Sequence, residues 1–199
     1  MHDPAPRHPV SPGRYTVEEY IGLIYDGVLG PDDRVELLEG VIVPMSPHDV
    51  PHAAGVTRAH EAVRNAVAGR AVVRCQLTFL AGRGSAPEPD VLVAPGTLAD
   101  YDHQHPHRAL LVIEVADSSL KADRLTKTAI YALARVPEFW IVNLPDACVE
   151  VHRDPDAVSG VYREVLVARP GDRLELTAIP GASVAIDDLL PTRIVSPVS

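Results

Sequence analysis

The chain has 199 residues, of which 46% are hydrophobic and 23% charged, a composition typical of one globular domain and not of a disordered chain. The sequence contains no run of about 18 apolar residues, so no membrane span is predicted. The N-terminal segment lacks the apolar stretch of a secretory signal. We therefore expect a cytoplasmic protein with no membrane partner. The net charge of −9 argues against non-specific binding to nucleic acid. Residues 51–135 nevertheless carry a charge of +2 and the remainder −11, so this middle segment is the part that suits a polyanion.

The predicted elements begin after a Pro- and His-rich tail at residues 1–14. Thr16 and Glu19 have the spacing of a capping box, which predicts a helix that ends at Gly30. A hairpin is expected next, turning near Glu39 and Gly40. The segment 47–52 is predicted to be a loop, and the apolar spacing of 53–68 indicates a second helix.

The middle of the chain predicts the order α-β-β-β-α-β. Its elements after the second helix are strands over 71–80, 90–94 and 109–116, a helix over 122–135, and a strand over 138–144. A strand, a helix and a strand in succession imply a right-handed crossover and a parallel pair. Further strands are expected over 147–152, 161–168, 173–178 and 183–186, with a closing turn at 187–190. We expect one domain over 15–190, a C-terminal tail over 191–199, and hairpins that extend the sheet or pack on its edge.

Two acidic residues stand out because they fall on adjacent apolar strands. Asp90 opens one strand, and Glu114 lies within the most hydrophobic strand of the chain. A buried carboxylate is costly unless it is paired or coordinates a metal, and a divalent cation would relieve the repulsion between two of them. The pattern alone also allows Glu114 to pair with an arginine or to reach solvent at the strand end.

The helix after Glu114 adds a second group of polar residues. Asp123, Lys127 and Tyr131 are spaced i, i+4 and i+8 and therefore share one helix face. If the helix packs back over the strand, Lys127 points at the carboxylates. The alternative is an exposed lysine that pairs with Asp123.

Six blocks in order resemble the Uma2 family of endonucleases, which belongs to the PD-(D/E)xK nuclease superfamily. They span roughly residues 15–185 and comprise Glu36–Gly40, Met45–Pro47, Pro89–Val91, Leu111–Val115, Asp123–Tyr131 and Val136–Val142. The resemblance implies an α/β fold with a restriction-endonuclease-like core, a mixed sheet flanked by helices. It also implies DNA phosphodiester hydrolysis that depends on Mg²⁺ (or Mn²⁺).

The resemblance also assigns roles to individual residues. Asp90 and Glu114 would hold the metal, with the Val115 carbonyl as a third ligand, and Lys127 would complete the catalytic set. Ala116 stands where the superfamily lysine would be, so the lysine is expected to come from the following helix. Supporting roles fall to Glu36, Asp123, Tyr131 and His52, the last towards substrate.

Two other functions stay open at this point. A catalytically silent member that binds nucleic acid or a protein partner fits Ala116 and the acidic total. A different metal-dependent hydrolase fits the same core. The sequence does not separate DNA from RNA as substrate, and a homodimer would suit duplex cleavage, which often uses two sites. The two cysteines, Cys75 and Cys148, are expected to be free thiols.

Overall fold

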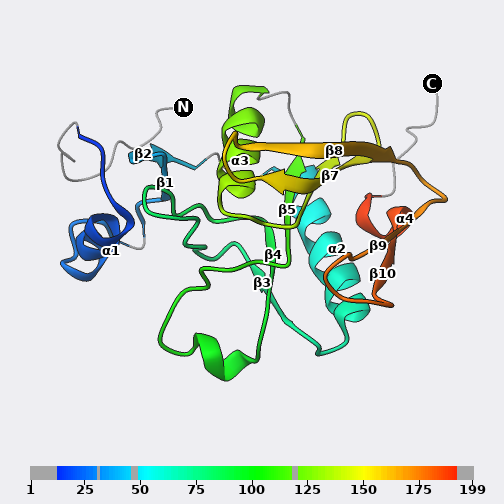
Figure 1. Ribbon diagram of the computed structural model, residues 1–199, viewed down its shortest axis with the longest axis horizontal. Helices are drawn as coiled ribbons and strands as arrows, with labels where there is room; N and C mark the ends of the chain where they lie inside the picture. Colours follow the sequence, from blue (N-terminus) through cyan, green and yellow to red (C-terminus); the bar gives the residue numbers. More distant parts are fainter. Residues whose placement is uncertain (1–12, 31, 46–48, 118–120, 192–199) are drawn as a thin grey trace.

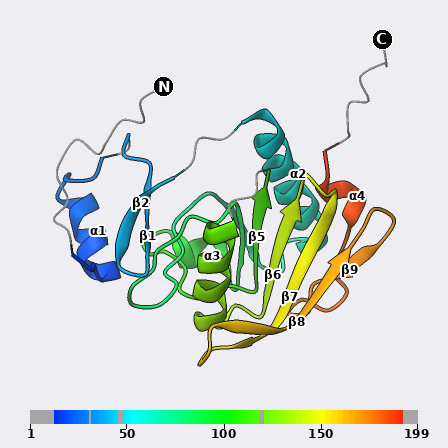
Figure 2. The same ribbon diagram turned by 90° about the horizontal axis from the view of Figure 1, so that it is seen from above.

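A six-stranded mixed sheet forms the centre of the computed structural model (Figures 1 and 2). The structure describes residues 13–30, 32–45, 49–117 and 121–191, and the side chains of 121–123 lie outside that description. In spatial order the strands are β3 (Val72–Cys75), β4 (Val91–Ala94), β5 (Leu111–Ala116), β6 (Glu138–Asn143), β7 (Cys148–Asp156) and β8 (Val161–Ala168). Strands β5 and β6 are parallel and the other neighbours antiparallel, which confirms the predicted mixed sheet.

Each face of the sheet has its own core, covered by its own helix. Side chains alternate along a strand, so Leu111, Ile113 and Val115 of β5 pack in the core that contains α2 (Val50–Val67). The other β5 side chains face α3 (Lys121–Leu133), which packs over Val112 and Ala116. Glu114 lies between these two in the sequence and therefore faces α3.

Smaller elements complete the fold. The hairpin of β1 (Val35–Leu38) and β2 (Val41–Pro44) forms a separate two-stranded sheet, as do β9 (Arg173–Glu175) and β10 (Ser183–Ala185). The β1–β2 turn has positive φ at both Glu39 (50°) and Gly40 (82°), as a tight hairpin turn requires. The remaining helices are α1 (Val17–Tyr25), η1 (Leu98–Tyr101) and α4 (Ile186–Leu189). Within the described residues, no helix combines the length and apolarity needed to cross a bilayer.

Two helix boundaries differ from the prediction. The first helix has the predicted capping box at Thr16, but it ends at Tyr25 and not at Gly30, because the chain caps at Asp26 and turns at Gly27 (φ 71°). The second helix begins at Val50, within the segment predicted to be a loop. Asp49 caps it by accepting a hydrogen bond from the His52 N–H at 3.0 Å. The first turn tolerates Pro51 because a backbone N–H at this position has no partner within the helix, so nothing is lost when proline lacks one.

The third predicted strand is also shorter than expected. β3 ends at Cys75, whereas the prediction extended to residue 80, because Gln76 adopts a left-handed backbone with φ 51° and leaves the sheet. Both cysteines are free, as predicted, with Cys75 half-buried and Cys148 buried. The predicted tails at 1–14 and 191–199 fall almost entirely outside the described residues, as do Ser46 and Pro47 of the family blocks.

Candidate active site

Asp90 lies where β4 and β5 stop pairing. The last paired residues are Val91 and Ile113, so two residues further along β5 the backbone N–H of Val115 lacks a strand partner. This N–H donates to Asp90 Oδ2 at 2.8 Å. By alternation from Leu92, which packs in the α3 core, Asp90 faces the same side of the sheet as Glu114. Since the N–H and C=O of a strand residue point to the same neighbour, the Val115 carbonyl also lies on this edge.

Two side chains also contact the Asp90 carboxylate. Gln76 Nε2 donates to Oδ1 at 3.2 Å, and His52 Nε2 lies 3.2 Å from Oδ2. Burial acts to raise the pKa of Asp90. Three donors oppose this effect and lower the pKa overall: His52, through a hydrogen bond and its charge, the Val115 N–H, and Gln76. The same hydrogen bond raises the pKa of His52 against the opposing effect of its burial. Asp90 is therefore an ionised carboxylate held by donors on both oxygens.

Glu114 is in a different electrostatic environment from Asp90. Tyr131 donates its hydroxyl to Oε1 at 2.6 Å, and Lys127 Nζ lies 3.3 Å from the same oxygen. Burial raises the pKa of Glu114 to about 7, the nearby Asp90 and Glu36 add to this rise, and Lys127 and Tyr131 oppose it. Glu114 therefore holds a proton to a higher pH than an ordinary glutamate does.

Lys127 connects the sheet to the β1–β2 hairpin. Its Nζ lies 3.2 Å from Glu36 Oε1 as well as near Glu114, and Figure 2 shows α3 lying between the hairpin and the sheet. Only 9% of Lys127 and 5% of Glu36 is exposed. The second oxygen of Glu36 accepts the backbone N–H of Glu88 at 3.1 Å. The alternative of a solvent-exposed lysine is therefore wrong, and the side chain of Asp123, its expected partner there, lies outside the described residues.

Two members of this cluster were missed from the sequence. Gln76 follows β3 directly, and the register that pairs Cys75 with Val91 places it opposite Asp90. Glu88 lies two residues before Asp90, and burial raises its pKa. A predicted antiparallel pairing of β3 with β4 would have identified Gln76.

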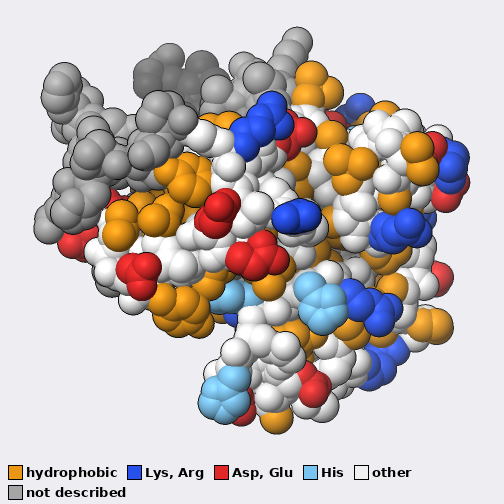
Figure 3. Space-filling model, turned by 60° about the vertical axis from the view of Figure 1, so that its left-hand side comes forward, with side chains coloured by type: hydrophobic (Ala, Val, Ile, Leu, Met, Phe, Trp, Pro, Cys, Tyr) orange, Lys and Arg blue, Asp and Glu red, His pale blue; other side chains and the backbone are white. Residues whose placement is uncertain are grey.

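The first turn of α2 contributes His52 to the site, and its side chain is 17% exposed. Asp49, which caps the helix, shares a hydrogen bond with Asp117, and this bond raises the pKa of Asp117 and lowers that of Asp49. On the face drawn in Figure 3, the coloured Lys and Arg side chains are scattered among acidic, histidine and apolar ones.

The donor atoms of the cluster fit a hard divalent cation. Among the described residues, no three or more His, Cys, Asp or Glu side chains are arranged to hold a metal ion. Mg²⁺, in contrast, is usually bound through one or two carboxylates and keeps several waters. Asp90, Glu114 and the Val115 carbonyl would offer oxygen atoms only, the donor type that Mg²⁺ or Mn²⁺ prefers.

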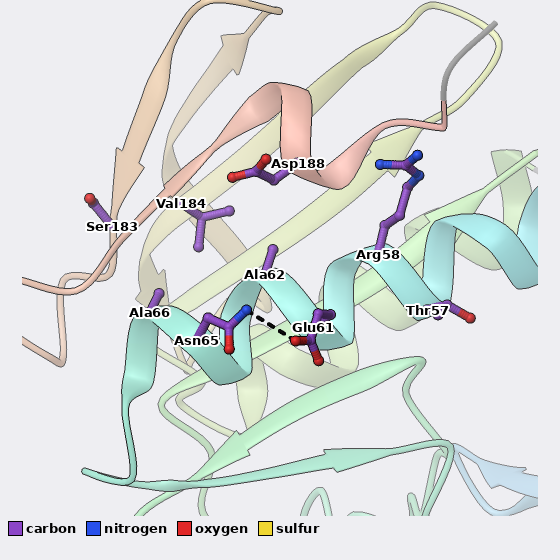
Figure 4. A pocket seen from close by; sticks show the side chains of 9 residues that line it. All are labelled: Thr57, Arg58, Glu61, Ala62, Asn65, Ala66, Ser183, Val184 and Asp188. Carbon is purple, nitrogen blue, oxygen red and sulfur yellow. Dashed lines mark hydrogen bonds between the residues drawn. The ribbon is translucent and has the colours of Figure 1, made fainter.

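A separate pocket of about 580 Å³ lies between α2 and the C-terminal elements. Figure 4 shows Glu61 and Asn65 on the helix side, joined by a hydrogen bond, with Ser183 and Asp188 across from them. None of the predicted site residues lines it. The pocket is therefore distinct from the carboxylate cluster.

Comparisons with known proteins agree with this architecture. The sequence model of the Uma2 family, described as "Putative restriction endonuclease", matches residues 17–187. A crystal structure described as that of "a putative nuclease belonging to DUF820", from Anabaena variabilis ATCC 29413, superposes with a TM-score of 0.65. It shares 18% identity, and the match covers 91% of this chain and 97% of that one, so it shows a common fold. No match was found among curated proteins.

Proposed function

The chain belongs to the Uma2 family, a family of restriction-endonuclease-like nucleases, and from this premise we propose that it is a Mg²⁺- or Mn²⁺-dependent endonuclease that hydrolyses DNA phosphodiester bonds. The observation that carries the proposal is the position of Lys127, 3.3 Å from Glu114. Glu114 and Asp90 face the same side of the sheet from neighbouring strands. The arrangement supplies metal ligands and a cation beside them although Ala116 occupies the usual lysine position.

Asp90, Glu114 and the Val115 carbonyl are the groups that would hold the cation. Bound there, a divalent ion polarises a phosphate and lowers the pKa of water. Asp90 is ready for this role because its donors keep it ionised. Glu114 must give up the proton that its raised pKa favours, so cation binding and proton release are coupled at this residue.

Lys127 is the candidate for handling charge at the reacting phosphate. An ammonium donor orients an attacking water or stabilises the charge that develops on phosphate oxygens. Glu36 fixes the lysine from the hairpin side through its 3.2 Å contact, and Tyr131 fixes Glu114 through its hydroxyl. His52 contacts Asp90 at 3.2 Å and is a candidate for contact with a substrate phosphate.

A substrate panel tests this proposal against its alternatives. Supercoiled plasmid, linear duplex DNA, single-stranded DNA and RNA are incubated with the protein in Mg²⁺, in Mn²⁺ and in EDTA. We expect cleavage of DNA that EDTA abolishes. Cleavage of RNA and not of DNA would contradict the proposed DNA substrate and show that the protein is a ribonuclease. No cleavage of any nucleic acid, together with binding of duplex DNA, would instead support a catalytically silent member.

A further inference from the structure

Gln76 reaches the Asp90 carboxylate from the strand on the other side of β4. Its backbone N–H donates to the Pro89 carbonyl at 3.1 Å, so one hydrogen bond joins it to the segment before β4. Its side-chain Nε2 donates to Asp90 Oδ1 at 3.2 Å. His52 and the Val115 N–H both contact Oδ2, and Gln76 donates to the other oxygen, Oδ1.

The backbone of Gln76 is held in a conformation that glutamine disfavours. Its φ of 51° lies in the left-handed region, which glycine adopts freely and side chains with a Cβ do not. Among the described residues, Ala68 has a similar φ of 50°, but it caps α2 at the helix end far from β4. Strained residues that persist at a cluster of polar groups point to a function for the strain.

The chemistry of the amide explains why glutamine suits this position. A neutral N–H donor holds an ionised carboxylate without adding positive charge, so it does not repel an incoming cation. The charged side chain of a lysine or an arginine at this position would lack this property. With a cation bound at Asp90, the Gln76 amide and the Val115 N–H would be the donors that keep the carboxylate oriented.

We propose that Gln76 is a positioning residue for Asp90: its left-handed backbone directs the amide at Oδ1 and fixes the carboxylate in its orientation for binding a cation. This inference rests on the proposed function for the part that concerns metal, whereas the orientation of Asp90 is a property of the protein alone. Groups that orient metal ligands contribute about 10–100-fold to metal affinity.

Three variants of the full chain separate positioning from strain. Gln76→Met keeps the length and the strained backbone and removes the donor, whereas Gln76→Gly removes both the donor and the strain. Ala68→Gly relieves the same strain away from the site and serves as the matched control. Affinity for Mn²⁺ alone is measured by titration calorimetry, thermal stability by melting temperature, and the Asp90 side chain by a crystal structure of Gln76→Gly.

We expect both Gln76 variants to bind Mn²⁺ about 10–100-fold more weakly, with Asp90 in a changed or multiple rotamer. Ala68→Gly should bind as the wild type does and should keep or raise the melting temperature. In Gln76→Gly the relief of strain is offset by the loss of a donor to the buried Asp90 carboxylate. Asp90 in its wild-type rotamer in Gln76→Gly would overturn the positioning role. Wild-type protein that binds no Mn²⁺ would instead contradict the proposed function, and the crystal structure would still decide the role of Gln76.

Discussion

Lys127 Nζ lies 3.3 Å from Glu114 Oε1, and this contact joins a helix to the strand that precedes it in the chain. The sequence after Glu114 has Ala116 where the superfamily places its lysine. The first turns of α3 bring an ammonium back to the same carboxylate. Because the ammonium also lies 3.2 Å from Glu36, one lysine pairs with two buried acids from separate sheets.

Replacing Lys127 by methionine should reduce the cleavage rate by about 10²–10³, the effect of removing one preorganised charge donor. It should also lower the free energy of unfolding by up to about 3 kcal/mol at pH 8, since two buried carboxylates lose their cation. Plasmid cleavage and chemical denaturation measure the two effects. The double variant Lys127→Met, Glu36→Gln should regain part of the stability and none of the activity. Full activity of Lys127→Met would exclude the role assigned to the ammonium.

Glu114 should make the metal-free protein less stable as the pH rises. Its pKa is about 7 in the folded protein against an ordinary 4.5, so between these values the unfolded chain loses a proton that the folded chain keeps. Stability therefore falls as the pH rises from 4.5 to 7, by up to about 3 kcal/mol at full ionisation. Glu114→Gln removes this loss. Its melting temperature should equal that of the wild type near pH 4.5 and exceed it above pH 7.

Asp90 provides a control of opposite sign for that experiment. Its pKa is lowered in the folded protein, so its ionised form stabilises the fold at neutral pH and the contribution is lost as the pH falls through the lowered value. Asp90→Asn should therefore lower the melting temperature at pH 8, where Glu114→Gln raises it. A gain in stability from both variants would show that repulsion between the two carboxylates outweighs the donors around Asp90.

Tyr131→Phe should shift the pH dependence of Mn²⁺ binding to higher pH by about one to two units, because a hydrogen bond to a charged group contributes about 1.5–3 kcal/mol. In the wild type, the Tyr131 hydroxyl lowers the pKa of Glu114. Without this hydroxyl, the proton on Glu114 competes with the cation up to a higher pH. The ring keeps its packing against Phe79 and Phe139, with centroids 6.4 and 5.0 Å away. Calorimetric titrations between pH 6 and 8.5 measure the shift, and an unchanged profile would show that the hydroxyl has no influence on Glu114.

The strands and the two acids on them could be predicted because their patterns are local. Continuous apolar runs marked β5 and β6, and a carboxylate within such a run is conspicuous whatever the remainder of the chain does. The parallel pairing of β5 with β6 followed from the handedness of a strand–helix–strand unit. Glu114 and Asp90 were therefore identifiable before any coordinates.

The remaining partners could not be derived from local patterns. Glu36 belongs to a hairpin outside the central sheet, and only the packing of α3 between them brings it to Lys127; its role came from the family resemblance. His52 falls in the Pro- and His-rich segment 47–52, which was predicted to be a loop, although proline is tolerated in a first helical turn. Gln76 depends on one left-handed residue, for which glutamine gives no indication in the sequence.

Affinity for DNA should depend only weakly on salt concentration. Residues 51–135, which contain most of the cluster, carry a charge of only +2 in a chain of −9. Each phosphate neutralised contributes roughly −0.9 to the slope of log K against log salt concentration, so few contacts give a shallow slope. Fluorescence anisotropy with a catalytically inactive variant in Ca²⁺ measures it. A slope that implies about ten phosphate contacts would place the substrate on a surface other than this one.

Plasmid cleavage by the wild type, Asp90→Asn and Glu61→Gln, each with Mg²⁺ and with EDTA, tests the central claim most directly. Glu61→Gln makes the same change from acid to amide in the separate pocket beside α2. We predict that wild type and Glu61→Gln cut in Mg²⁺ and not in EDTA, and that Asp90→Asn loses at least about 10² in rate, since it removes a ligand of the proposed metal site. Cleavage that persists in EDTA, or an Asp90→Asn variant as active as the wild type, would contradict a metal-dependent nuclease centred on Asp90 and Glu114.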